Sequence, residues 1–148
     1  MFSADEDHQL EVLDEDECRR LLATAAIGRL AFTQDALPAI QPVSFAVHDG
    51  HVMIPTRAGS KLAAASRGAV VAFEVDSFDV ASRTGWNVTV IGASRVVIDP
   101  AERTALEARS LRPWAATSDV CYIAISMGIL EGRRIRAAQP GGGAGSRG

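Results

Sequence analysis

Hydrophobic and polar residues follow two different periods along the chain, and the first of them is helical. Between residues 14 and 28 the apolar residues recur at the spacing of one helix face. These residues are Cys18, Leu21, Leu22 and Ala25. Asp14 with Glu17 three residues later resembles a capping box, and Gly28 is expected to end the helix. Two further short helices are predicted over residues 61–66 and 99–111.

Between these helices the period falls to two, which is typical of strands. The predicted strands cover residues 29–33, 40–47, 51–56, 69–76, 86–98 and 120–126. Asp49-Gly50 predicts a tight hairpin turn, and Gly92 inside the longest strand predicts a bulge or a barrel corner. This pattern favours a mainly β fold with short helices, an antiparallel six-stranded barrel that is closed or partly closed. Because side chains fill a barrel of this size, a ligand is expected outside it or at a seam between subunits.

Composition divides the chain into three parts. Residues 1–12 are acidic and predict a flexible leader, and residues 13–136 predict a single domain. Residues 137–148 contain five glycines and a proline, which predicts a disordered tail. The chain as a whole is 47% hydrophobic and 22% charged, as expected of a globular protein.

Charge is distributed unevenly and restricts the classes of partner. The first 17 residues carry eight acids and no base, so the rest has ten acids, fifteen bases and a net charge of +5. Such a body could attract an anionic small molecule, or it could be an ordinary solvated surface. The basic residues are scattered and few aromatics accompany them, which argues against nucleic acid as a partner. The sequence has no signal-peptide pattern, no apolar run near the ~20 residues of a membrane span and no C-x-x-C pair, so we expect a cytoplasmic protein.

The segment from Thr56 to Leu62 is the strongest candidate for a binding site. A predicted strand ends there, a loop with Gly59 follows, and a helix begins at or just after Ser60. Free backbone N–H groups at a helix N-terminus attract a phosphate. Thr56 and Ser60 add hydroxyl donors, and Lys61, the only lysine of the chain, adds an ammonium. The alternative is that Ser60 simply caps the helix and Lys61 is a surface residue.

Seven short motifs occur in an order that identifies a family. They are Glu17-Cys18-Arg19-Arg20-Leu21-Leu22, Gly28-Arg29-Leu30-Ala31-Phe32, Pro38-x-Ile40-x-Pro42-Val43-Ser44-Phe45, Gly59-Ser60-Lys61-Leu62, Val71-Ala72-Phe73-Glu74-Val75-Asp76, Gly85-Trp86-Asn87-Val88 and Gly132-Arg133-Arg134-Ile135. Together they resemble the pyridoxamine 5′-phosphate oxidase-like family of FMN-binding split barrels. The resemblance implies a six-stranded split β-barrel that forms a homodimer, with two FMN sites at the interface.

For the phosphate end of the cofactor, the resemblance implies Thr56, Ser60 and Lys61. The chain departs from the family at one nearby position. The family often has arginine where this chain has Pro55, which removes a positive charge close to the expected phosphate. Arg57, two residues further on, is a candidate substitute.

For the ring end, the resemblance implies Val43 and Ser44, which would offer backbone contacts along the isoalloxazine. Asn87 would reach the polar edge of the ring, and Trp86 would lie nearby. Arg134 is a further candidate, which the other subunit could lend. The family often has asparagine where this chain has Ser44, and serine where it has Asn87.

The sequence contains no readable Ser/His/Asp set. A flavin supplies hydride or electron chemistry itself, which explains why none is needed. The resemblance therefore implies an FMN-dependent oxidoreductase that acts on a small-molecule substrate. Two alternatives stay open: a deazaflavin coenzyme on the same fold, and a non-enzymatic carrier or sensor that binds flavin or haem.

Three other groups of side chains have alternative interpretations. His48 and His51 flank the predicted turn and could ligate a metal, but no third ligand is evident and they are expected to be exposed. Glu74 and the acids that follow it could act in acid–base chemistry or form a solvated strand end. Trp114 is expected to pack over the barrel or over the flavin.

Overall fold

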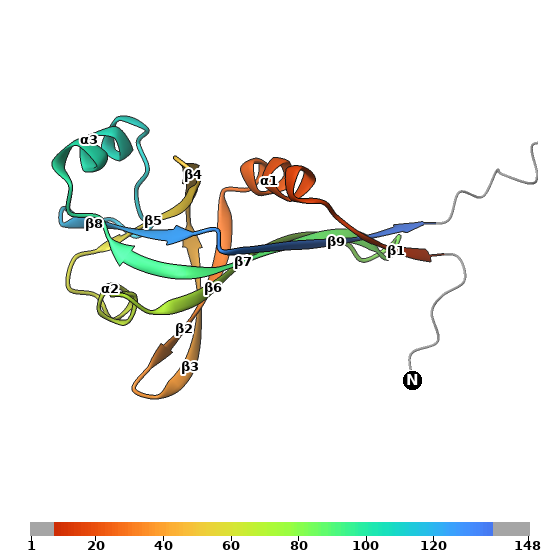
Figure 1. The fold of residues 1–148 in the computed structure, drawn as a ribbon, viewed down its shortest axis with the longest axis horizontal. Coiled ribbons are helices and arrows are strands. Elements are labelled where there is room, and N and C mark those ends of the chain that lie inside the picture. The colour runs from red at the N-terminus through yellow and green to blue at the C-terminus, as the bar shows by residue number, and fades with distance from the viewer. Residues whose placement is uncertain (1–7, 138–148) are drawn as a thin grey trace, which may run out of the picture.

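The structure, a computed structural model, describes residues 8–137 and folds them into a curled antiparallel sheet with three short helices (Figure 1). The elements are β1 (His8–Val12), α1 (Glu15–Thr24), β2 (Ile27–Gln34), β3 (Leu37–Ser44), β4 (Ala46–His48), β5 (His51–Arg57), α2 (Lys61–Ala65), β6 (Val70–Asp79), β7 (Thr84–Val96), α3 (Pro100–Ala108), β8 (Val120–Ser126) and β9 (Ile129–Ala137). The strand order is β3-β2-β6-β7-β8-β5-β4, and β9 pairs with β7 and β1. No helix among residues 8–137 is long and apolar enough to cross a membrane.

Strand β7 joins the two halves of the sheet. One edge of it pairs with β6, and the other edge pairs with β9 over residues 85–91 and with β8 over residues 94–96. Gly92 lies at the change of partner, where an added Cβ would stand 1.8 Å from the backbone oxygen of Ser126. The predicted barrel corner at Gly92 is therefore confirmed, because only a residue without a side chain fits this crossing.

A second change of half-sheet occurs at Phe45, where the sequence predicted one continuous strand. β3 pairs with β2 as far as Ser44, and the chain then continues as β4, which pairs with β5. The Phe45 side chain is buried, and its ring packs edge-on against Phe73 with centroids 4.8 Å apart. Burial of this ring holds the bend and carries the chain from one half-sheet to the other.

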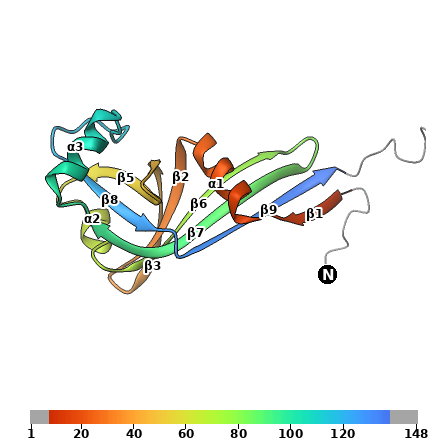
Figure 2. The ribbon, with the colours of Figure 1, turned by 45° about the horizontal axis from the view of Figure 1, so that its top comes forward.

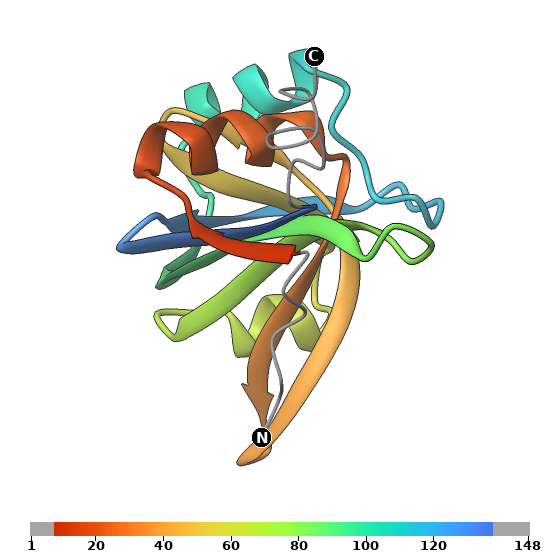
Figure 3. The same ribbon diagram turned by 90° about the vertical axis from the view of Figure 1, so that its right-hand side faces the viewer.

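The helices cover the curled sheet at different places. Figure 2 shows α1 lying along β7 and β9, and Figure 3 shows α1 and α3 on one side of the molecule with α2 on the other. Asp14 caps α1 by accepting a hydrogen bond from the Glu17 N–H at 2.8 Å. Asp99 caps α3 in the same way, with proline at the first helical position as the sequence predicts. Cys18 is buried, with Leu21 and Leu22, in the main core.

The prediction of six strands is wrong in number, since residues 8–137 form nine. The predicted flexible leader is wrong for residues 8–12, which form β1 against β9. The acids of this segment are not simply solvated: Glu11 accepts a hydrogen bond from Arg136 at 2.5 Å. Gly28 does not end a helix but lies inside β2, where a side chain would collide with the Phe73 ring. Residues 1–7 and the predicted tail from residue 138 lie outside the described residues.

Candidate functional site

A cavity of about 550 Å³ opens where β3 and β5 separate. In the register of β4 and β5, Ala46 pairs with Met53, so continued pairing would place Ser44 opposite Pro55. The ladder stops there, because proline has no N–H to donate. The gap is lined by Ile27, Gln41, Pro42, Val43, Ser44, Pro55, Thr56, Arg57, Ser60, Leu62, Pro113, Trp114, Ala115, Ala116 and Thr117. Its volume lies within the range of small-molecule sites, roughly 300–1,000 Å³.

Most residues that line the cavity are apolar, and Gln41, Ser44 and Thr117 are polar residues among them. Where β5 leads into α2, Thr56, Arg57 and Ser60 gather polar groups that we call the polar end. The polar end holds Thr56 and Ser60, whose hydroxyl oxygens lie 3.1 Å apart. Ser60 also caps α2 by accepting a hydrogen bond from the Ala63 N–H at 3.1 Å. Of the described residues that line the cavity, only Arg57 carries a charge. The site thus suits an apolar ring joined to an anionic group.

Besides β3 and β5, a loop of residues 113–117 forms a third wall of the cavity. Two hydrogen bonds hold the residues just before this loop. The Ser44 hydroxyl donates to the backbone oxygen of Arg112 at 3.0 Å. The buried Tyr122 hydroxyl donates to the backbone oxygen of Leu111 at 3.1 Å, and burial raises the pKa of this phenol. Ser44 therefore holds a neighbouring loop in place through its side chain, in addition to the backbone role that the resemblance implies.

The eight residues implied by the resemblance do not gather in one place within a single chain. Four of them line the cavity: Val43, Ser44, Thr56 and Ser60. Lys61 is exposed at the start of α2 and makes no ion pair with any residue of the described range 8–137. The other three residues are on β7 and β9.

Those three residues lie on opposite faces of the sheet. Trp86 and Arg134 are cross-strand partners and line a cavity of about 1010 Å³ beside α1. Asn87 is the next residue along β7, so its side chain points to the other face. There it lines a smaller cavity of about 230 Å³ with Arg133 and Thr89.

Comparison with known proteins now gives the family. The model of the family described as pyridoxamine 5′-phosphate oxidase matches residues 14–134. This chain belongs to that family. It is 45% identical over 130 residues to the uncharacterized protein Rv0080 of Mycobacterium tuberculosis, which covers 84% of this chain and 85% of that protein.

Solved structures agree with this placement in the pyridoxamine 5′-phosphate oxidase family. The FAD binding protein from Mycobacterium smegmatis is 35% identical, with a TM-score of 0.75 over 85% of this chain and 98% of that chain. A FAD-binding protein from Mesorhizobium loti, 22% identical, has a TM-score of 0.71 over 87% of this chain and 98% of that chain, which shows the shared fold. The predicted mainly β, antiparallel split-barrel fold is confirmed.

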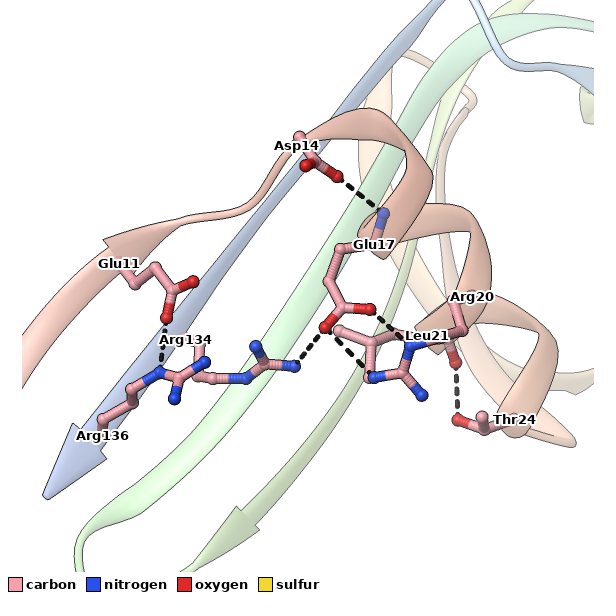
Figure 4. Close-up of polar contacts among 8 residues, drawn as sticks. All are labelled: Glu11, Asp14, Glu17, Arg20, Leu21, Thr24, Arg134 and Arg136. Atoms are coloured by element: carbon pink, nitrogen blue, oxygen red, sulfur yellow. Dashed lines mark hydrogen bonds and ion pairs between the residues drawn. The ribbon is translucent and has the colours of Figure 1, made fainter.

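Arg134, which the family resemblance assigned to the cofactor, takes part in an ion-pair cluster beside α1. Figure 4 shows the Glu17 carboxylate between Arg20 of α1 and Arg134 of β9, with Arg134 at 2.9 Å. The hydrogen bonds from Arg20, and then from Arg134, lower the pKa of Glu17 to about 2. The Arg134 side chain is only 18% exposed. Within one chain, Arg134 therefore ties β9 to α1.

Sequence reasoning considered Trp114 but missed the rest of the loop wall of the cavity. Residues 113–117 follow a helix and carry no binding motif; the only signal is the helix-breaking Pro113 next to an aromatic residue. Trp114 does not pack over the barrel, because its side chain is 78% exposed at the edge of the cavity.

The remaining candidate groups lie outside this cavity. Glu74 and Asp76 share the guanidinium of Arg29, and burial followed by the neighbouring Asp76 raises the pKa of Glu74. His48 and His51 are partners across the β4–β5 turn. No cluster of three or more metal-ligating side chains occurs in the described part of the chain.

The Glu17 cluster predicts a pH-dependent contribution to stability. The carboxyl has a lowered pKa when folded, so its contribution is complete above the ordinary value near 4.5 and is lost as the pH falls towards 2. We expect Glu17→Gln to lower the urea midpoint at pH 7 and the difference from the native protein to shrink below pH 4.5. Glu15→Gln, two residues earlier in α1 and highly exposed, is the control and should change little. A Glu17→Gln deficit that stays constant from pH 7 to pH 2 would contradict this assignment.

Proposed function

We propose that this chain binds a flavin nucleotide in the cavity between β3 and β5 and uses it for redox chemistry. The observation that carries the proposal is an apolar cavity of about 550 Å³ with one cationic end, in a chain 35% identical to a FAD binding protein. The cavity lies at the split of the barrel, where β3 and β5 separate.

The isoalloxazine ring would lie along the end of β3. Val43 is buried and Pro42 is exposed, and together they give the wall an apolar surface. Among residues 8–137, β3 pairs with β2 and with no other strand, so one of its edges has no partner there. The Phe45 N–H donates to the Ala26 carbonyl, so in this register the backbone groups of Val43 face β2 and those of Ser44 face the free edge. Ser44 could therefore offer its backbone groups to the polar atoms of the ring.

The phosphate would lie at the polar end of the cavity. Thr56 and Ser60 supply hydroxyls, and Arg57 supplies a guanidinium that can bind a phosphate through two hydrogen bonds. α2 has only five residues, so its N-terminus adds little to this end. Lys61 lies next to the cavity and is not part of its wall. Its ammonium would therefore attract the phosphate only from a distance, whereas Arg57 would bind the phosphate directly.

The kind of flavin is the finer part of the proposal. FMN and FAD share the ring and the first phosphate, and the 35% identical relative is a FAD binding protein, which favours FAD. A deazaflavin coenzyme would place the same ring in the same cavity. Haem is less suited, because its usual axial ligands are His, Cys, Met or Tyr, and none of these lines the cavity among the described residues.

A homodimer would complete the site. The sheet face opposite α1 has an apolar row that crosses five strands, with each residue the register partner of the next. The row consists of Ile40, Ala31, Ala72, Ile91 and Ile129. Ile40 and Ile129 are exposed, as expected of a surface that a partner covers. Asn87 lies on this same face, so a second copy could carry its Asn87 towards the cavity.

Redox chemistry fits the cavity better than acid–base chemistry does. No carboxylate, histidine or cysteine is found among the described residues that line it. A bound flavin supplies the hydride or electron transfer, and this chain positions the ring, excludes water with its apolar walls and neutralises the phosphate. The second candidate is a flavin carrier that binds the same group without turnover.

The first prediction concerns the phosphate end. Arg57→Ala should raise the Kd for flavin at least tenfold, which corresponds to about 1.4 kcal/mol. Lys61→Ala should raise it less, because Arg57 lines the cavity and Lys61 does not. Fluorescence titration with FAD and FMN measures both. Arg67→Ala, an exposed arginine just after α2 and outside the cavity, is the matched control. A Kd that is the same in Arg57→Ala, Lys61→Ala and the native protein would refute this placement of the phosphate.

The second prediction concerns the apolar row. Ala72→Arg puts a charge at the middle of the row and should convert a dimer into a monomer in light scattering coupled to gel filtration. Ala23→Arg adds the same charge on the exposed face of α1 and should leave the dimer intact. If the native protein is a monomer at micromolar concentration, or if Ala72→Arg stays dimeric, the row is not the interface.

The third prediction separates the enzyme from the carrier. The flavin-loaded protein should reduce an artificial acceptor repeatedly at the expense of NADH or NADPH, and Arg57→Ala should lose this activity together with the flavin. Tight flavin binding with no turnover across a panel of acceptors would favour the carrier.

A further inference from the structure

Hydrogen bonds hold the chain on both sides of the wall formed by residues 113–117. On one side, Ser44 and Tyr122 hold the backbone of residues 111–112. On the other side, the Ala58 N–H donates to the backbone oxygen of Asp119 at 2.8 Å. Between these attachments the chain runs beside the cavity and carries Trp114 at its edge.

The exposure of Trp114 is costly for a side chain of its size. An indole is largely apolar, and 78% of this one is in contact with water. Its neighbours Ala115 and Ala116 are too small to cover it, and Pro113 restricts the backbone before it. Of the described residues that line the cavity, Trp114 is the only aromatic one. A large apolar ring left open at the mouth of an apolar cavity is a surface that a ligand can cover.

We infer that Trp114 contacts the bound ligand directly, with its indole stacked on the open face of a planar aromatic ring seated against Val43. The inference rests on the flavin proposed above and extends it, since neither the family motifs nor the phosphate end involves this residue. Stacking with an aromatic ring adds affinity without requiring a hydrogen bond. Trp114 thereby closes the cavity, and it selects ligands with a flat ring over equally anionic ligands without one.

The other tryptophan supplies an internal comparison. Trp86 lies on the α1 side of the sheet, packs against the core and lines a different cavity. The two tryptophans therefore differ in the one property that the inference uses, which is contact with the cavity between β3 and β5.

The test measures the emission of bound FMN together with its Kd. Contact with an indole quenches flavin emission by electron transfer, which phenylalanine does not support. We expect FMN bound to the native protein and to Trp86→Phe to be weakly fluorescent, and FMN bound to Trp114→Phe to be several-fold brighter. Trp114→Phe should keep most of the affinity because it keeps a ring, whereas Trp114→Ala should raise the Kd about tenfold.

Each outcome has a distinct meaning. Since Trp114 is exposed, the thermal midpoints of its variants should equal that of the native protein, which makes a loss of affinity a local effect. FMN that binds Trp114→Ala as tightly as the native protein, or that brightens in Trp86→Phe but not in Trp114→Phe, overturns the inference and leaves the flavin proposal standing. If the native protein does not bind FMN or FAD at all, the flavin proposal itself fails.

Discussion

The whole arrangement depends on one crossing of backbones at Gly92. Here β7 leaves β9 and meets β8, and the Ser126 backbone approaches so closely that an added Cβ would lie 1.8 Å from its oxygen. The crossing divides one sheet into two halves that curl towards each other. The bend at Phe45 is its counterpart, because there the chain passes from the first half to the second. The chain passes between the two half-sheets at this bend without a continuous ladder of backbone pairs. An opening therefore remains beside the bend, between β3 and β5.

The opening becomes a binding cavity because of a few local features. Pro55 prevents the pairing of β5 with β4 from continuing to the end of β3, so no backbone fills the gap between β3 and β5. Ser60 caps α2, and its hydroxyl lies with that of Thr56 at one end of the cavity. Ser44 and Tyr122 hold the residues just before the loop that forms the third wall. None of these features is an active-site motif by itself. Together they form a pocket with apolar walls and a single charge, which is the chemistry of a ring joined to a phosphate.

The sequence predicted the local elements of this fold better than their connections. The cap at Asp99 and the hairpin at Asp49-Gly50 depend on neighbouring residues, and a glycine inside a strand is by itself a signal for the corner at Gly92. The structure confirms all three. β1 escaped prediction because its pairing with β9 joins residues more than a hundred positions apart, and its acids suggested a solvated leader. The break at Phe45 likewise depends on a contact with Phe73, which periodicity does not reveal.

For the site, the strand-end and loop motifs indicated four cavity residues, whereas in the wall at residues 113–117 only Trp114 was considered, and no motif accompanied it. Trp86, Asn87 and Arg134 were grouped by their order in the sequence. The pleat of β7 separates Trp86 from Asn87, and the Glu17 carboxylate engages Arg134 within its own chain. The order of motifs in a sequence therefore indicates which residues a family has in common. Within one chain, the pleat of the strand and the ion pairs determine which of these residues lie on the same face.

A crystal structure of the protein grown with FAD tests the central claim most directly. If the flavin binds as proposed, density for its ring lies between the end of β3 and residues 113–117, with the first phosphate beside Arg57 and Thr56. Density for the ring in the cavity that Trp86 and Arg134 line, with the cavity between β3 and β5 empty, would contradict it.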